Sequence, residues 1–376
     1  MLYFHIPFCA QKCSYCNFHF STSLQQMEPM VQGLISELEQ RRDELENPHI
    51  ETLYFGGGTP SLLSSKDLGR IVDAVEKQYV LDSHLEFTLE ANPDDLSAGY
   101  LRELKEIGVN RLSVGTQSFF EKDLRLMNRA HSASQAEDSI KRAQDMGITN
   151  ISLDLIYGSP GTELGEWRKN LEKAVALGVV HISSYAMTVE PRTALHHWVE
   201  TGKVPAPEEK VQAQAFDYVH EYLSSQGFEH YEISNFALPG KRSRHNAAYW
   251  GSRPYLGIGP SAHSFDGGRK RSWNIANNAL YLKHLHEPAV RMESEILSDS
   301  ERYNERIMVG LRTLEGVDVR TLAPLLNESM EAHFKRESEK KLQQGLLVAK
   351  GHFLSVPVAH WFLSDGIASD LFYLET

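Results

Sequence analysis

The three cysteines of this chain, Cys9, Cys13 and Cys16, all lie on one short stretch near the start of the sequence. Three thiols in 376 residues cannot form a disulfide framework, and thiols gathered in this way are typical metal ligands. In a [4Fe–4S] cluster they would hold three irons and leave the fourth iron open to bind a small chelating molecule. In a zinc site, His5 or His19 would supply the fourth ligand. The spacing alone predicts a metal centre and leaves both kinds open.

Polar or glycine-rich runs follow five of the predicted strands, at the point where each strand ends. These runs are residues 5–9, 56–60, 90–93, 116–119 and 154–158. In barrels of parallel strands, the loops at the carboxyl ends of the strands build the active site. We therefore expect the five runs, and with them the cysteines, to meet at one rim.

Short β-branched or aromatic stretches alternate with longer amphipathic ones in the first 200 residues. Strands are predicted at residues 2–6, 52–55, 85–89, 111–115, 151–156 and 182–186, and helices at 29–45, 65–78, 98–107, 134–146 and 164–176. Several helices end at a glycine, as at Gly108, Gly147 and Gly178. This alternation indicates right-handed βαβ units and a parallel sheet. Six units predict an α/β fold, an open, partial (βα)6 TIM-like barrel over residues 1–200.

The alternation fades after about residue 205. Residues 201–295 are predicted to be a connecting region, with a helix over 208–226 and a loop over 239–278 that is rich in Gly, Pro, Ser, Asn and His. Residues 296–376 are predicted to form a small, mostly helical C-terminal domain. Its predicted elements are helices over 299–314, 319–325 and 329–344, a β-like segment over 346–356 and a last helix from residue 364.

Composition excludes several classes of protein. The formal net charge of −12 argues against a nucleic-acid-binding surface as the main function. No stretch approaches the roughly 18 consecutive apolar residues that would span a bilayer, and the first residues do not resemble a signal peptide. We expect a cytoplasmic protein whose association with a membrane, if any, is peripheral.

The pattern Cys-x3-Cys-x2-Cys, with Tyr15 just before the third cysteine, resembles the signature of the radical S-adenosylmethionine (SAM) family. The partial barrel predicted from the strand pattern is also the architecture of that family. The resemblance implies that Cys9, Cys13 and Cys16 hold a [4Fe–4S] cluster and that SAM chelates its open iron. Reduction would then cleave SAM to methionine and a 5′-deoxyadenosyl radical.

The resemblance also assigns contacts to SAM. The run Gly56, Gly57, Gly58, Thr59 resembles the glycine-rich SAM loop, and Glu90 matches the carboxylate that accepts ribose hydroxyls. Further positions that match SAM contacts are Tyr3, Gln117, Arg129 and Asp154. Four of these assignments have a structural alternative: a tight turn for the glycines, a helix N-cap or a surface acid for Glu90, a surface salt bridge for Arg129 and a core aromatic for Tyr3.

Within the family, the first 190 residues resemble the coproporphyrinogen dehydrogenase branch. That branch contains the oxygen-independent coproporphyrinogen III oxidase and a haem chaperone, which binds haem and hands it to acceptor haem proteins. Three features favour the chaperone. Phe18 stands where the oxidase has a fourth cysteine, the chain reaches Cys9 without the N-terminal arm of the oxidase, and residues 245–250 match an HNxxYW motif of the chaperone subfamily. The oxidase stays the alternative.

The HNxxYW segment suggests a haem contact. Imidazole is a good iron ligand, and the Tyr249 and Trp250 rings could stack on a planar macrocycle. We therefore expect His245 to take part in holding haem as cargo, although a hydrogen-bonded His245 beside packed aromatic rings is the structural alternative. Other histidines are available as axial ligands, among them His196, His197 and His263. The resemblance is also compatible with a homodimer, for which no stripe in the sequence identifies an interface.

Overall fold

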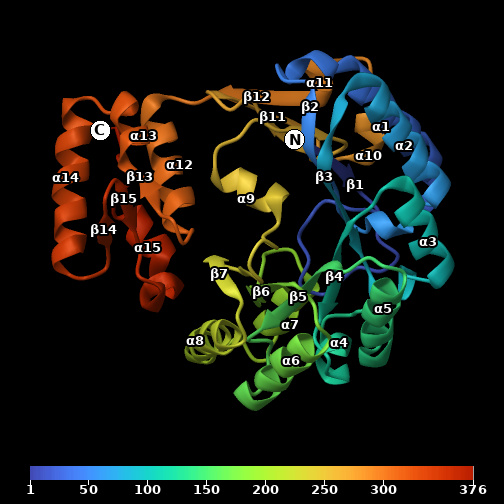
Figure 1. Ribbon diagram of the computed structural model, residues 1–376, viewed down its shortest axis with the longest axis horizontal. Helices are drawn as coiled ribbons and strands as arrows, with labels where there is room; N and C mark the ends of the chain where they lie inside the picture. Colours follow the sequence, from blue (N-terminus) through green and yellow to red (C-terminus); the bar gives the residue numbers. More distant parts are fainter. Residues whose placement is uncertain (376) are drawn as a thin grey trace.

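Six parallel strands form the body of a curved, nine-stranded sheet in the computed structural model, which describes residues 1–375 (Figure 1). They are β1 (Leu2–Ile6), β2 (His49–Gly57), β3 (Val80–Ala91), β4 (Arg111–Gln117), β5 (Asn150–Tyr157) and β6 (His181–Ala186). Their order in the sheet is their order in the chain, and each pairs in parallel with the next. The predicted partial (βα)6 barrel is confirmed.

Helices between these strands cover the outer face of the sheet (Figure 1). They are α1 (Met27–Gln40), α2 (Ser65–Gln78), α3 (Ala98–Ile107), α4 (Glu121–Leu126), α5 (Ala133–Asp145) and α6 (Leu164–Ala176). Ser64 and Ser97 cap α2 and α3 by accepting hydrogen bonds from backbone N–H groups of the first turn. The helix predicted over residues 29–45 is too long, because α1 ends at Gln40 and a separate 3-10 turn (Arg42–Glu44) follows.

Side chains alternate between the two faces of each parallel strand, and this alternation makes the barrel interior polar. On β1 the even-numbered residues are fully buried beneath the helices, whereas Tyr3 and His5 face the interior. The same alternation on β3 and β5 directs Glu90 and Asp154 inward. The interior is therefore lined by hydroxyl, imidazole and carboxylate groups that can bind a polar ligand.

The prediction of a loop over residues 239–278 is wrong, because that stretch contains several short helices and strands. They are α9 (Arg244–Trp250), β9 (Leu256–Ile258), β10 (His263–Phe265) and β11 (Lys270–Asn274). β9 joins the open edge of β1 in parallel, and β10 and β11 form a second sheet with β12 (Met292–Ile296). Elements of three to seven residues carry too little hydrophobic periodicity to be recognised. Their hydrogen bonds come from neighbours distant in the sequence.

The remaining elements of the connecting region extend the barrel at its other edge. β7 (Glu229–Glu232) and β8 (Asn235–Ala237) add antiparallel strands beside β6. α7 (Ala194–Glu200) precedes this region, whose own helices are α8 (Glu209–Ser225), α10 (Asn278–Lys283) and α11 (Pro288–Arg291), besides α9. The helix predicted over residues 208–226 is α8.

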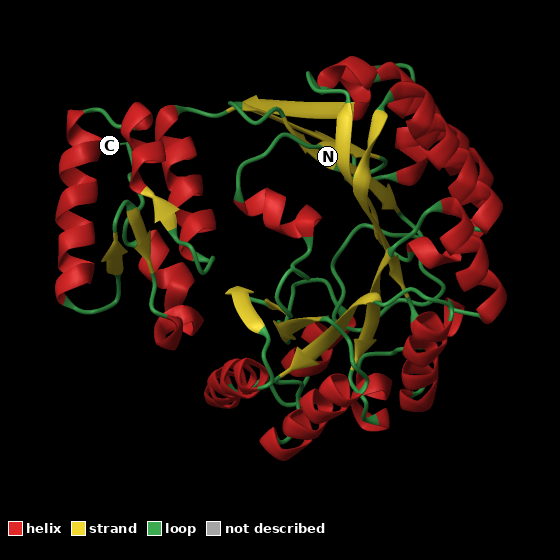
Figure 2. Cartoon of the chain, viewed as in Figure 1, coloured by secondary structure: helices red, strands yellow, loops and turns green. Residues whose placement is uncertain are grey.

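The C-terminal domain packs helices around a small antiparallel sheet (Figure 2). Its elements are α12 (Asp299–Leu311), β13 (Val317–Asp318), α13 (Val319–Leu322), α14 (Glu328–Gln343), β14 (Val348–Lys350), β15 (Phe353–Ser355) and α15 (Ser364–Ser369). The Trp361 ring packs edge-on against His230, with ring centroids 4.4 Å apart, which joins this domain to the barrel. None of the described helices is long and apolar enough to cross a bilayer.

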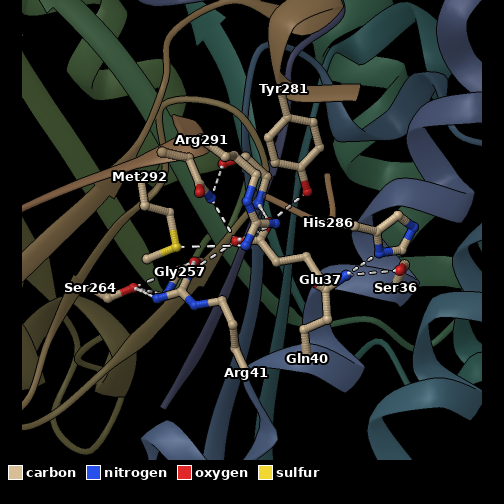
Figure 3. Close-up of polar contacts among 12 residues, drawn as sticks. Ser36, Glu37, Gln40, Arg41, Gly257, Ser264, Tyr281, His286, Arg291 and Met292 are labelled. Carbon is tan, nitrogen blue, oxygen red and sulfur yellow. Dashed lines mark hydrogen bonds and ion pairs between the residues drawn. The ribbon is translucent and has the colours of Figure 1, made fainter. Parts of the chain in front are cut away.

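A buried ion network joins the connecting region to α1 (Figure 3). The fully buried Glu37 carboxylate accepts hydrogen bonds from Arg41 Nη1 at 2.8 Å, from the Tyr281 hydroxyl at 2.5 Å and from Asn274 Nδ2 at 2.7 Å. The equally buried Arg291 places Nη1 3.4 Å from Glu37 Oε1. One carboxylate therefore holds together α1, α10, β11 and α11.

We expect Glu37→Ala to lower the free energy of unfolding by about 3–5 kcal/mol, because two buried guanidinium groups lose their shared carboxylate. Urea denaturation of the full chain measures the change. Glu39→Ala, at an exposed position of the same helix, is the matched control and should change stability by less than about 0.5 kcal/mol. Equal stability of the two variants would contradict the assigned role of Glu37.

Candidate cofactor site

The cysteine loop, residues 9–16, leaves the carboxyl end of β1 and is fixed by backbone hydrogen bonds. The Cys9 amide donates to the Ser21 carbonyl at 3.0 Å, and the Ser14 amide donates to the Met127 carbonyl at 3.0 Å. All three thiols of the loop are free and half-buried. The predicted group of thiols is therefore carried on one anchored loop.

The thiols match the donor set of an iron–sulfur cluster. Burial raises the pKa of Cys9 to about 11, and nearby Cys13 and Cys16 add to the rise. Burial also raises the pKa of Cys16. These two thiols are therefore protonated at neutral pH in the metal-free chain, and metal binding would release their protons. The loop contains no carboxylate that would favour a hard metal ion.

The zinc alternative does not fit the structure. His5 Nδ1 lies 3.1 Å from the Tyr3 hydroxyl, and His5 Nε2 lies 3.0 Å from the His19 carbonyl oxygen. His19 Nε2 lies 2.7 Å from Asn278 Oδ1. Within residues 1–375, no three Cys, His, Asp or Glu side chains gather closely enough for a single metal ion. A cube of four irons spreads its ligand sulfurs more widely, so it does not need so compact a group.

Arg129 lies against the cysteine loop. Its Nη1 donates to Cys13 Sγ at 3.2 Å, and its Nη2 donates to Asn92 Oδ1 at 2.6 Å and to the Gly115 carbonyl at 2.7 Å. Across residues 1–375 it pairs with no carboxylate, and its Nε has no hydrogen-bond partner. The surface salt bridge that the sequence left open is therefore not formed. The guanidinium keeps its charge available beside the thiols.

The glycine run at the end of β2 is packed against the segment that leads from β1 into the cysteine loop. Gly58 donates to the Ile6 carbonyl at 2.9 Å, and Thr59 donates to the Phe8 carbonyl at 2.7 Å. A Cβ on Gly58 would lie 2.5 Å from the Phe8 carbonyl oxygen, and Gly57 has a φ of +112°. Close backbone packing requires glycine at position 58, and the positive φ favours glycine at position 57. Their contact with SAM stays a prediction.

Glu90 and Asp154 are two carboxyl groups of the barrel interior. Glu90 accepts hydrogen bonds from the Tyr54 hydroxyl at 2.7 Å and from the Gly57 amide at 3.2 Å. Burial raises its pKa to about 7, and the charge of Asp154 adds to the rise. Burial likewise raises the pKa of Asp154 to about 6, while Ser113 donates to both of its oxygens. Both carboxyl groups therefore change their protonation state near neutral pH, and their oxygens can accept hydrogen bonds from hydroxyl groups.

Gln117 and Arg129 meet beside Gly115 at the end of β4. A Cβ on Gly115 would lie 3.0 Å from Gln117 Nε2 and 3.2 Å from Arg129 Nη2. Gln117 has a φ of +67°, at a point where the register between β4 and β5 shifts. A non-glycine residue in this conformation is strained, and such strain is frequent at functional sites.

A cavity of about 450 Å³, which we call the barrel cavity, opens beside Glu90, whereas Gln117, Arg129, Asp154 and the three cysteines are not among its lining residues. Its walls include the predicted Tyr3, Gly57 and Glu90, together with residues that no SAM motif had singled out: His5, Phe18, Tyr249, Tyr255, Ser261 and His263. The sequence pattern could not have placed Phe18, Tyr255 or His263 here, because they come from loops and a three-residue strand.

His245 lies in a buried hydrogen-bond network. It is 1% exposed, its Nδ1 lies 2.8 Å from Thr52 Oγ1, and its Nε2 lies 3.0 Å from the Tyr249 hydroxyl. Its ring stacks on Tyr54, with centroids 4.8 Å apart. Both ring nitrogens are therefore engaged, which is the structural alternative stated for this residue. Axial ligation of haem by His245 would require this network to open.

Models of two protein families match the chain. The Radical SAM superfamily matches residues 3–174, and the HemN C-terminal domain matches residues 297–363. Together the two matches cover most of the barrel and most of the C-terminal domain.

Two bacterial proteins named heme chaperone HemW are similar to this chain over nearly its whole length. The protein of Bacillus subtilis (strain 168) is 34% identical over 92% of this chain and 92% of its own. That of Lactococcus lactis subsp. lactis (strain IL1403) is 34% identical over 97% of each chain.

Among solved structures, coproporphyrinogen III oxidase (HemN) from Escherichia coli, a radical SAM enzyme, shares the fold. It matches with a TM-score of 0.85 at 21% identity, over 99% of this chain and 89% of its own.

We expect Gly58→Ala to lower both the melting temperature and the iron and sulfide bound per chain after anaerobic reconstitution, because the added methyl group would push the cysteine loop away from β2. Gly69→Ala is the matched control, since a Cβ there meets no atom within 4 Å. Because Gly69 lies inside α2, this control should raise stability by about 0.5–1 kcal/mol. Full cluster content in Gly58→Ala would refute the packing role.

We expect Glu90→Gln to stabilise the cluster-free chain, with a gain that grows as the pH rises from about 4.5 to about 7 and is constant at higher pH. The folded state holds the Glu90 carboxyl with a pKa of about 7, above its ordinary value of 4.5, so folding opposes ionisation over this range. The gain should reach about 1–3 kcal/mol at pH 8.5, since one pKa unit is worth about 1.4 kcal/mol. Urea denaturation at several pH values measures it, and exposed Glu103→Gln is the control. A gain in stability that does not change with pH would show that the raised pKa of Glu90 is not its cause.

Proposed function

This chain belongs to the HemW family within the radical SAM superfamily, and from that premise we propose that it is a haem chaperone, which binds haem and transfers it to acceptor haem proteins. The observation that carries the proposal is the similarity to two proteins named heme chaperone HemW over 92% and 97% of this chain. The similarity is not confined to the barrel, which the whole superfamily shares.

Cys9, Cys13 and Cys16 would hold a [4Fe–4S] cluster, and the barrel cavity would hold SAM. The cluster and SAM together supply one-electron and radical chemistry when bound. Among the chain's own residues, Arg129 places a positive charge beside the cysteine loop, where it can pair with a carboxylate of the ligand. Glu90 offers a buried oxygen to ribose hydroxyls. Both residues would orient SAM toward the loop.

His263 fits the role of axial haem ligand better than His245. It is exposed at the mouth of the barrel cavity. Its Nδ1 lies 3.0 Å from the Ser261 carbonyl oxygen, so Nδ1 carries the proton and Nε2 keeps its lone pair. Phe18 is 71% exposed at the same mouth and offers a flat apolar ring to a macrocycle. His245 would support this face from within the barrel.

The first test is turnover of porphyrin. We expect the reconstituted and reduced chain, incubated anaerobically with SAM and coproporphyrinogen III, to form no mono- or divinyl product on chromatography. A coproporphyrinogen oxidase assayed in parallel is the positive control. Product formation over many turnovers would make the chain an oxidase and overturn the proposal.

The second test is haem binding and transfer. We expect the full chain to bind one haem and to lose it to an apo-haem protein, which is followed by the change in the Soret band. His263→Ala should shift the Soret band, because the axial ligand is lost, whereas His245→Gln should keep the spectrum. The reverse pattern would restore His245 as ligand, and no haem binding by the wild type would refute the chaperone function.

A further inference from the structure

A second cavity, of about 200 Å³, shares two lining rings with the barrel cavity. These rings are Tyr249 and Tyr255, which meet edge to face with centroids 4.7 Å apart. The second cavity is lined by residues of α9, of β10 and β11, and of α12 of the C-terminal domain. The two tyrosines therefore make the two cavities neighbours.

Four guanidinium groups line this second cavity, which we call the arginine pocket: Arg253, Arg271, Arg302 and Arg306. One carboxylate, that of Glu305, lines it with them and pairs with Arg271 at 2.5 Å. Such a surplus of positive charge stands out in a chain whose net charge is −12.

Partners outside the pocket neutralise only part of this charge. Arg253 pairs with Glu51 at 2.6 Å, and Arg302 pairs with Asp299 at 3.1 Å. Arg306 donates to the Thr321 carbonyl and, within residues 1–375, lies within 4.0 Å of no carboxylate. Its charge is therefore free to meet a ligand.

Arg302 and Arg306 stand one turn apart on the same face of α12. Like charges at this spacing repel each other and destabilise a helix. Burial lowers the pKa of Arg306, and the charge of Arg302 lowers it further. An anion between the two side chains would remove the repulsion.

The lining of the pocket also includes a neutral hydrogen-bond donor for which the described residues supply no acceptor. The indole nitrogen of Trp250, another lining residue, is buried and has no hydrogen-bond partner among the described residues. A buried donor without an acceptor destabilises the folded chain. The pocket therefore combines cationic donors, one orphaned neutral donor and aromatic rings.

We propose that the arginine pocket binds the propionate carboxylates of haem, so that the C-terminal domain forms part of the haem site. The inference rests on the proposed haem-binding function. The guanidinium group of arginine suits a carboxylate because it can donate two parallel hydrogen bonds to the carboxylate oxygens. At about 200 Å³, the pocket is smaller than the roughly 300–1,000 Å³ typical of sites that enclose a ligand. It therefore takes the propionate edge, and the rest of the macrocycle lies outside it against aromatic rings.

The test compares haem with haem dimethyl ester, whose carboxylates are neutral. Both are titrated into the reconstituted full chain and followed at the Soret band. The wild type should bind haem at least about tenfold more tightly than the ester. The double variant Arg302→Gln/Arg306→Gln should lose this preference by weakening haem binding alone, with the Soret position unchanged because the iron is not touched. Arg320→Gln, an exposed arginine of the same domain, should behave as the wild type.

The outcomes separate this inference from the proposed function. If the wild type binds neither porphyrin, the chaperone function fails. If it binds haem and ester equally tightly, haem binding stands and the arginine pocket is refuted without recourse to any variant. If the double variant folds, as judged by circular dichroism, and still prefers haem tenfold, the carboxylates are bound elsewhere and the inference is also refuted.

Discussion

The two-residue period of the parallel strands is the constraint on which the rest of the molecule depends. One face of each strand must be apolar to pack beneath the helices, so every second residue is free to be polar and turns inward. Tyr3, Glu90 and Asp154 come from three different strands and reach the same interior for this reason alone. The cysteine loop follows the first of these strands and is fixed beside the interior by backbone hydrogen bonds to neighbouring segments.

A polar interior is unfavourable unless its groups have partners or a ligand. Tyr54 and the Gly57 amide satisfy Glu90, and serine hydroxyls satisfy Asp154, yet burial still raises the pKa of both acids. The two carboxyl groups therefore have enough hydrogen-bond partners for the barrel to fold, but their negative charges are only partly compensated. The Glu37 network, in contrast, pairs its carboxylate with two guanidinium groups and serves to fasten the connecting region (Figure 3).

The sequence was sufficient to predict the elements that are long and periodic. The pattern predicted both ends of four elements correctly: β1, α2, α3 and α6. This was possible because the periodic pattern of buried residues lies within each element and the residues that cap the helices lie next to them in the sequence. In the connecting region α8 was predictable, but the short strands were not, since they exist only through pairing with β1, with β6 and with one another. For the same reason the motif at residues 245–250 could be recognised but not interpreted: its imidazole turns inward to Thr52. Only the three-dimensional structure brings Tyr249 beside arginines that lie more than fifty residues away.

The placement of β1 has a consequence for how the chain is made. β1 is translated before β2 and β9, yet it lies between them, and Leu2 pairs with Leu256. Because domains fold as their parts become available during synthesis, one side of β1 stays unpaired until residue 256 has been translated. The strand that leads into the cysteine loop thus gains its second neighbour late. A nascent chain stalled before residue 256 would expose that edge, with three free thiols beside it, to whatever binds unpaired strands in the cell.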